Sequence, residues 1–129
     1  TRRSGQMLGQ ALSAGMMARG ATVTFLGIIP TPGVSYLTKT LNADAGVVIS
    51  ASHNPFDDNG IKFFNSKGEK LSDEVEKTIE EWLDQGHDFS PVTGKDIGTS
   101  HRYRRDSNDY MKFLLSHAPF LDGMRVGID

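Results

Sequence analysis

Apolar residues recur along this chain in two patterns, one typical of helices and one typical of buried strands. Spacings of three and four predict a helix over about residues 5–19, with Ser4 available as its cap. A second, short helix is expected to start at Thr31-Pro32 and to carry Val34, Leu37 and Leu41 on one face. The β-branched and apolar run 22–29 lies between the two helices and favours a buried strand.

The middle of the chain continues this alternation. Residues 45–50 form another continuous apolar run, residues 61–64 resume extended structure, and residues 66–69 favour a turn. Ser72 is the expected cap of the most clearly amphipathic helix, which we expect to end at Gly86. The apolar stripe of that helix, which we expect to be buried, consists of Val75, Ile79, Trp82 and Leu83.

The apolar pattern lapses and then returns toward the end of the chain. From residue 87 to about 102, Gly, Ser, Thr and Pro accumulate, so we expect a linker. A helix is predicted over roughly residues 104–117, and residues 123–129 are typical of the start of a strand. The inward residues of that last helix are expected to be Tyr110, Phe113 and Leu114. Alternating helices and apolar strands favour a three-layer α/β domain.

Composition and charge exclude several classes of protein. The 129 residues include 14 Lys and Arg against 16 Asp and Glu, so the formal charge of −2 gives no reason to expect a nucleic-acid or membrane partner. The absence of Cys excludes disulfides and thiolate metal sites, and it is compatible with the cytosol. No apolar run approaches the roughly 20 residues of a membrane-spanning helix.

The groups that carry chemistry gather in the polar loop that follows the apolar run 45–50. A hydroxyl (Ser52), an imidazole (His53), an amide (Asn54) and an ammonium (Lys62) lie within about ten residues, beyond the carboxyl end of a strand. Such a set suits phosphoryl transfer, in which a hydroxyl carries the group while other groups stabilise charge and move a proton. The same composition also suits a solvated connection, with Lys62 as a solvent-facing strand residue.

Other common sites fit the sequence poorly. A calcium loop fails because Pro55 and Ser66 occupy its first and last ligand positions. The four histidines are far apart in sequence and predict no zinc cluster, and the common nucleotide-binding and metalloprotease motifs are absent.

Three segments together resemble the α-D-phosphohexomutases, and their particular form is most similar to bacterial members that act on glucosamine phosphates. The segments are Thr1-Arg2-Arg3-Ser4-Gly5, Ile29-Pro30-Thr31-Pro32-Gly33, and Ser50-Ala51-Ser52-His53-Asn54-Pro55 followed by Asp58-Asn59-Gly60-Ile61-Lys62-Phe63.

This resemblance implies a fold and a domain division. Residues 1–101 are expected to form the α/β/α first domain with a mixed, mostly buried sheet, lacking its first strand and including the linker. Residues 102–129 are expected to form the connecting helix and the truncated first strand of a second domain. The likeness extends over nearly the whole chain.

The resemblance also implies roles for individual residues. Ser52 would carry the phosphoryl group and bind Mg²⁺, His53 would position or protonate at the phosphoryl site, and Lys62 would act as an acid/base or as a cation. Asn54 and Arg2 would support substrate binding. In this family the phosphoserine converts glucosamine 6-phosphate into a 1,6-bisphosphate intermediate, and the reoriented sugar then returns its other phosphate to the serine.

Several expectations depend on parts of the family pattern that this sequence lacks. The metal-binding aspartates, the sugar-selecting loop and the phosphate-binding domain would follow Asp129. We therefore expect residues 1–129 alone to be inactive. The complete enzyme would be cytoplasmic, compatible with a homodimer, and active in the amino-sugar metabolism that supplies peptidoglycan precursors. The alternatives are a phosphoglucomutase/phosphomannomutase specificity and a non-catalytic α/β binding module that retains the loop.

Overall fold

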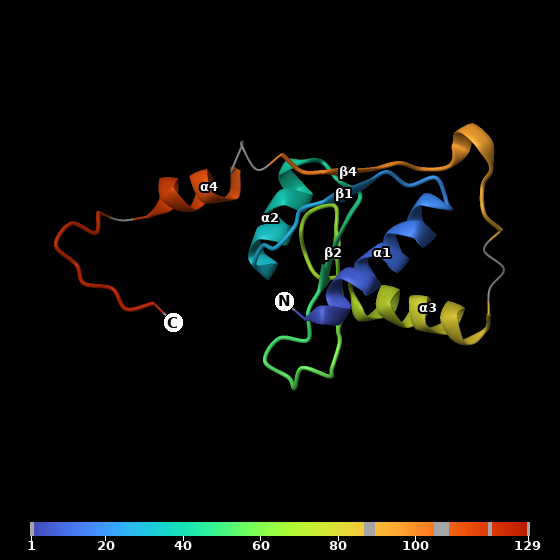
Figure 1. Ribbon diagram of the computed structural model, residues 1–129, viewed down its shortest axis with the longest axis horizontal. Helices are drawn as coiled ribbons and strands as arrows, with labels where there is room; N and C mark the ends of the chain where they lie inside the picture. Colours follow the sequence, from blue (N-terminus) through green and yellow to red (C-terminus); the bar gives the residue numbers. More distant parts are fainter. Residues whose placement is uncertain (1, 87–89, 105–108, 119, 129) are drawn as a thin grey trace.

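The computed structural model describes residues 2–86, 90–104, 109–118 and 120–128 (Figure 1). Helices and strands alternate along the chain, as the apolar pattern predicts. In order, the elements are α1 (Arg3–Met17), β1 (Val23–Phe25), α2 (Thr31–Thr40), β2 (Ala45–Ile49), β3 (Ile61–Asn65), α3 (Asp73–Asp84), a short 3-10 helix (Gly94–Asp96), β4 (Ser100–Arg102) and α4 (Asp109–His117).

The described strands pair in two small sheets, one parallel and one antiparallel. β1 pairs with β4 in parallel, and β2 pairs with β3 in antiparallel register, with Val48 opposite Lys62 and Val47 opposite Phe63. The predicted mixture of strand directions is therefore present. Burial is lower than expected, because all residues of β4 are exposed and β3 contains no buried residue.

Helices cover both faces of β2. A Cβ built on Gly46 would meet the side chain of Thr38 in α2, whereas one built on Gly9 in α1 would meet the side chain of Ile49. Gly46 and Ile49 are an odd number of positions apart on the strand, so their side-chain positions point to opposite faces. α1 and α2 consequently lie on opposite sides of β2, which is the layering expected of an α/β/α domain.

The core lies between α2 and β2. Its buried apolar residues are Val34, Leu37 and Val48, so two of the three residues predicted for the inner face of α2 are confirmed. Leu41, the third, is 42% exposed because α2 ends at Thr40 and Leu41 occupies the cap position.

Helix α3 forms where it is predicted, but its apolar stripe is not buried. Val75, Trp82 and Leu83 are exposed, and no residue of α3 is buried. Ser72 occupies the N-cap position, yet its side chain makes no capping hydrogen bond. The prediction of a buried stripe with a side-chain cap is therefore wrong for the described residues.

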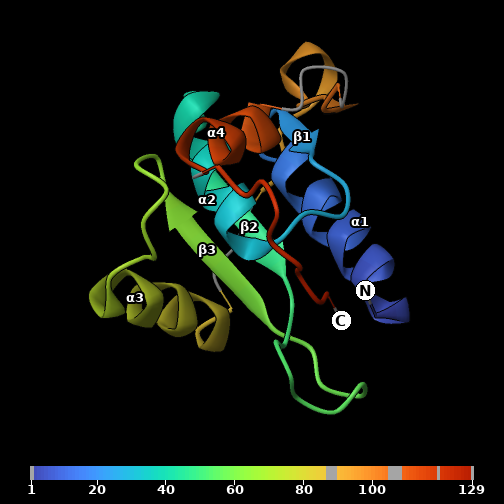
Figure 2. The same cartoon turned by 90° about the vertical axis from the view of Figure 1, so that its left-hand side faces the viewer.

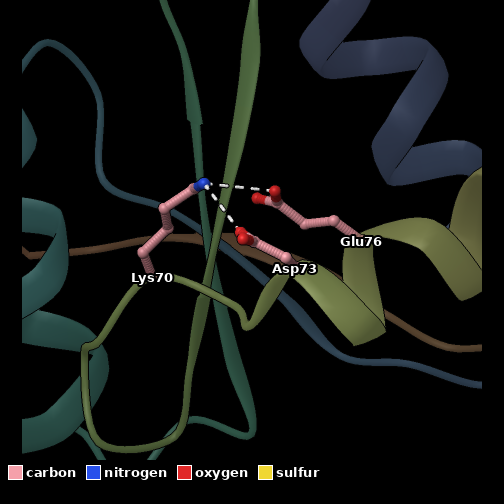
Figure 3. A network of polar contacts seen from close by, with 3 residues as sticks. All are labelled: Lys70, Asp73 and Glu76. Carbon is pink, nitrogen blue, oxygen red and sulfur yellow. Dashed lines mark hydrogen bonds and ion pairs between the residues drawn. The ribbon is translucent and has the colours of Figure 1, made fainter.

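An exposed ion-pair network lies at the start of α3 instead (Figure 3). Lys70 Nζ lies 3.1 Å from a Glu76 carboxylate oxygen and 4.0 Å from one of Asp73. Solvent screens such exposed pairs, so the network contributes little to the stability of the helix.

The first helix and strand are displaced or shortened relative to the prediction. α1 begins at Arg3, so Ser4 lies inside the helix and Arg2 occupies the N-cap position. β1 ends at Phe25 instead of continuing to residue 29, because Gly27 has a φ of +78°, which an extended strand does not accommodate.

The second half of the chain departs further from the prediction. The expected linker contains β4, whose pairing with β1 has no apolar signature in sequence. Residues 124–128 form no strand, because after the turn in which Met124 N–H donates to the Leu121 carbonyl they have no described strand to pair with. Parts of the predicted linker (87–89), helix (105–108) and strand (129) lie outside the described residues.

Helix α4 lies against α2, as Figure 2 shows. Its Phe113 ring stacks on Tyr36 of α2, with ring centroids 4.3 Å apart, and Tyr110 also contacts Tyr36. The prediction that these residues face inward holds in part: Tyr110 and Phe113 contact Tyr36 of α2, but Phe113 is still 36% exposed and Leu114 is 43% exposed.

Candidate functional site

The connection between β2 and β3 projects away from the sheet in both views (Figures 1 and 2). Its two ends are held together because the Ser50 N–H donates to the Gly60 carbonyl over 2.8 Å. A Cβ on Gly60 would lie 2.7 Å from the Ser50 carbonyl oxygen, so only glycine permits this close approach. We call residues 51–59 the loop.

Ser52 has an unusual backbone conformation at the start of the loop. Its φ of +54° places a residue with a side chain in the left-handed region, which costs roughly 1–2 kcal/mol. Its N–H donates to the Ser50 hydroxyl oxygen over 3.1 Å, which helps to hold this conformation. The Ser52 side chain is exposed, so its hydroxyl is accessible to an incoming ligand.

The hydroxyl of Ser52 lies beside the imidazole of His53. Ser52 Oγ and His53 Nδ1 are 3.1 Å apart, within hydrogen-bond distance. An unprotonated Nδ1 accepts the hydroxyl proton, whereas a protonated one donates to an oxygen at the Ser52 position. The pair therefore has the donor and acceptor groups that proton movement at this oxygen requires.

The start of α1 holds the loop from one side. One terminal nitrogen of Arg2 donates to the Asn54 carbonyl over 2.6 Å, and the other donates to the Asp58 carbonyl. The Ser4 hydroxyl donates to the side-chain oxygen of Asn59. The resemblance assigned Arg2 to substrate binding, but in the structure its two terminal nitrogens contact the backbone of the loop.

Lys62 lies on β3, directly opposite Val48 of β2. Opposed residues of an antiparallel pair share a face, so Lys62 lies on the face of Gly46 and Val48 that α2 covers further along. Its side chain is exposed. Among the described residues no hydrogen bond or ion pair joins Lys62 to Ser52 or His53, so the structure brings together the serine and the histidine but not the lysine.

An open cavity of about 450 Å³ lies between the start of α1 and the loop. It is lined by Arg2, Arg3, Ser4, Phe56, Asp57 and Asn59. Phe56 and Asn59 belong to the loop itself, whereas no local pattern in the sequence links Arg3 and Ser4 to it, because they lie more than 45 positions earlier.

A second cavity, of about 520 Å³, lies between α2 and α4 and is lined in part by Tyr36 and Phe113. None of the predicted site residues lines it. The candidate site is therefore placed at the loop, where the reactive groups converge, although the other cavity is larger.

The described residues do not form a complete metal site. They contain no group of three or more His, Asp or Glu side chains that would hold an ion. Mg²⁺ requires a near-octahedral shell of oxygen ligands, and Ser52 supplies at most one position of such a shell. Within the same part of the chain, no helix has the length and apolar character needed to cross a bilayer.

Comparison with known families agrees with this fold and loop. Residues 1–88 match the model for phosphoglucomutase/phosphomannomutase, alpha/beta/alpha domain I. The chain therefore belongs to the phosphoglucomutase/phosphomannomutase family, and its α/β/α architecture and the resemblance drawn from its motifs are confirmed.

The chain is also similar to individual proteins of known name. The chain is 54% identical over its whole length to a phosphoglucosamine mutase of Deinococcus deserti and 55% identical to that of Deinococcus radiodurans, covering 29% of each relative. It is 54% identical to the phosphoglucosamine mutase of Thermus thermophilus, of which it covers 28%. The chain thus spans less than a third of the length of these relatives.

Proposed function

We propose that this chain supplies the phosphoserine domain of a phosphosugar mutase that interconverts glucosamine 6-phosphate and glucosamine 1-phosphate. The observation that carries the proposal is Ser52: an exposed hydroxyl in a left-handed backbone conformation, 3.1 Å from an imidazole nitrogen, beyond the carboxyl end of β2. Strained residues of this kind cluster at functional sites. The relatives that share more than half of its residues are named phosphoglucosamine mutases, which favours this sugar over glucose or mannose phosphates.

The proposed reaction consists of two phosphoryl transfers. In the first, the bond between phosphorus and Ser52 Oγ breaks and Oγ takes up a proton, while a bond from phosphorus to the sugar O1 forms and the O1 proton passes to a base, which gives the 1,6-bisphosphate. In the second, after the sugar has reoriented, the bond between phosphorus and O6 breaks and O6 takes up a proton, while Ser52 Oγ gives up its proton to a base and is phosphorylated again. The atoms balance and the net change is an isomerisation.

His53 and Lys62 have distinct proposed roles in these steps. The imidazole of His53 lies 3.1 Å from Ser52 Oγ and would hold or donate a proton at that oxygen. Lys62 would act as an acid/base or stabilise charge on the transferring group once the substrate is bound. The exposed Asn54 would contribute its side-chain amide to the substrate.

Mg²⁺ remains part of the proposal only as a group that phosphorylated Ser52 would help to bind. The described residues do not complete its shell, so no step is assigned to it. We further propose that the complete enzyme works in the cytoplasm, in the amino-sugar metabolism that leads to peptidoglycan precursors, and that it is compatible with a homodimer.

A graft tests the function directly. Residues 1–129 replace the aligned segment of the Deinococcus deserti enzyme, over which the two sequences are 54% identical, and interconversion of the glucosamine phosphates is assayed. We expect turnover and phosphate on Ser52 by peptide mass spectrometry. Ser52→Ala should abolish both, whereas the matched control Ser66→Ala, in the turn after β3, should change neither.

Two results would contradict the proposal. Phosphate found on Ser50 and never on Ser52 would mean that Ser52 is not the phosphorylated residue. A folded Ser52→Ala graft that retains turnover would exclude a mechanism through phosphoserine 52. A folded wild-type graft without activity or phosphate would favour the non-catalytic binding module. The sugar preference itself requires the full-length protein that carries this chain, compared on glucosamine, glucose and mannose phosphates.

A further inference from the structure

The guanidinium of Arg2 joins two points of the loop that are four positions apart. One terminal nitrogen donates to the Asn54 carbonyl over 2.6 Å and the other to the Asp58 carbonyl. Arginine presents its donors in a rigid planar fork, so two contacts from one guanidinium fix the distance between the two acceptors. The carbonyls of Asn54 and Asp58 flank a turn that is closed by Asp58 N–H donating to the Pro55 carbonyl over 3.1 Å.

We propose that Arg2 is a positioning residue that clamps the loop and so fixes Ser52 and His53, rather than a ligand of the sugar phosphate. This inference rests on the proposed function, since it concerns the same reaction. The two terminal nitrogens of Arg2 that would contact a phosphate are already engaged by backbone carbonyls.

Packing alone does not hold the loop. Every residue from 52 to 59 is exposed, so few apolar contacts restrain it. The left-handed backbone of Ser52 is itself unfavourable and persists only when its surroundings impose it. The Arg2 contacts begin at Asn54, two residues after Ser52. The N–H of Asn54 also donates to the Ala51 carbonyl over 3.1 Å, which closes a turn that contains Ser52 and His53. Arg2 therefore holds the residue at which that turn ends.

Ser4 adds a second point of attachment from the same helix. Its hydroxyl donates to the Asn59 side-chain oxygen, and the Asn59 amide nitrogen lies 3.3 Å from the Asp57 carbonyl, to which it donates. Because Arg2 and Ser4 both lie at the start of α1, their contacts fix the position of the loop relative to that helix.

The test compares Arg2→Met and Arg2→Lys with the matched control Arg19→Met in the grafted enzyme. Arg19 also donates from its guanidinium to a backbone carbonyl, that of Ser90, but near the opposite end of α1. We measure hydrogen exchange of the loop amides by mass spectrometry, and kcat and KM for the sugar phosphate. A misplacement of about 1 Å can reduce a rate on the order of 100-fold, which is the fall in kcat expected for Arg2→Met.

We expect Arg2→Met to accelerate loop exchange and lower kcat while KM stays nearly constant. Arg2→Lys should restore little of the loss, because an ammonium does not reproduce the two-donor fork. Arg19→Met should leave kcat, KM and loop exchange unchanged. If Arg2→Met fails to fold, Ser4→Ala provides a milder perturbation that should also accelerate exchange in residues 57–59.

Distinct outcomes overturn the inference. A raised KM with unchanged kcat and unchanged loop exchange would make Arg2 a substrate ligand. Unchanged kinetics together with unchanged exchange would mean that the contacts do not restrain the loop. Because hydrogen exchange requires no activity, an inactive wild-type graft whose loop is nevertheless loosened by Arg2→Met would support the clamp while contradicting the proposed function.

Discussion

Replacing Gly46 by alanine tests the packing that gives the loop its fixed base. The added Cβ would lie 2.0 Å from Thr38 Oγ1 and 3.3 Å from Thr38 Cγ2, well inside ordinary contact distance. Thr38 is only 4% exposed, and its hydroxyl donates to the Val34 carbonyl over 2.8 Å. The side chain therefore has to leave its position or α2 has to move away from β2.

The expected cost combines two effects. Overpacking a close contact costs about 1–3 kcal/mol, and loss of the Thr38 hydrogen bond costs about 0.5–1.5 kcal/mol. We therefore expect Gly46→Ala to lower the free energy of unfolding by about 1.5–4.5 kcal/mol. Thr38→Ala in the same background removes both clashing atoms and leaves only a Cβ at 3.1 Å, so it should recover about 1–3 kcal/mol of coupling energy.

Urea denaturation of the chain, followed by circular dichroism, measures these differences. Gly15→Ala is the matched control, because Gly15 lies in α1 and a Cβ there meets nothing within 4 Å. That control should raise stability by roughly 0.5–1 kcal/mol through helix propensity. A Gly46→Ala variant as stable as the wild type, or one that Thr38→Ala does not improve, would refute the close packing of α2 on β2.

Three further predictions concern the site. In the grafted enzyme Lys62→Met should lower kcat much more than it raises KM, because a cation or acid at the reacting oxygen acts mainly in the transition state; unchanged kinetics would make Lys62 a simple surface residue. Ser52→Gly should be about 1 kcal/mol more stable than Ser52→Ala, because glycine tolerates the φ of +54°; equal stabilities in urea would contradict the left-handed conformation. The chain by itself should show no multi-turnover mutase activity and no firm binding of Mg²⁺ in calorimetric titration, and enzyme-like turnover would contradict our assignment of the missing groups.

The parts of the fold that are predicted well are those specified by residues close together in the sequence. The continuous apolar run 45–50 and the Thr31-Pro32 start specify β2 and α2 within a residue, because burial and capping act over short distances. β4 could not be predicted, because its three residues are exposed and become a strand only by pairing with β1, more than 70 positions earlier. The apolar stripe of α3 shows that an amphipathic pattern predicts a helix but does not determine how deeply its apolar face is buried.

The candidate site likewise contains contacts that the local sequence predicts and contacts that it does not. Ser52 and His53 are neighbours in sequence, so their 3.1 Å contact follows from local chemistry. Arg2 and its acceptors are separated by 52 and 56 positions, and no spacing rule links them. Ser4 is a related case, because a residue that favours helix caps is used inside the helix to hold Asn59.

Among the described residues, the hydrogen bonds that hold the loop, apart from the pairing of β2 with β3 at its base, come from residues before β3. β2, packed on α2 through Gly46 and Thr38, fixes the base of the loop, and the start of α1 fixes one flank through Arg2 and Ser4. α3, β4 and α4 contribute none of these contacts. Under the proposed function, the groups that position the acceptor sugar and complete a metal shell would be supplied by other parts of a longer enzyme. The relatives, of which this chain covers 28–29%, are long enough to supply them.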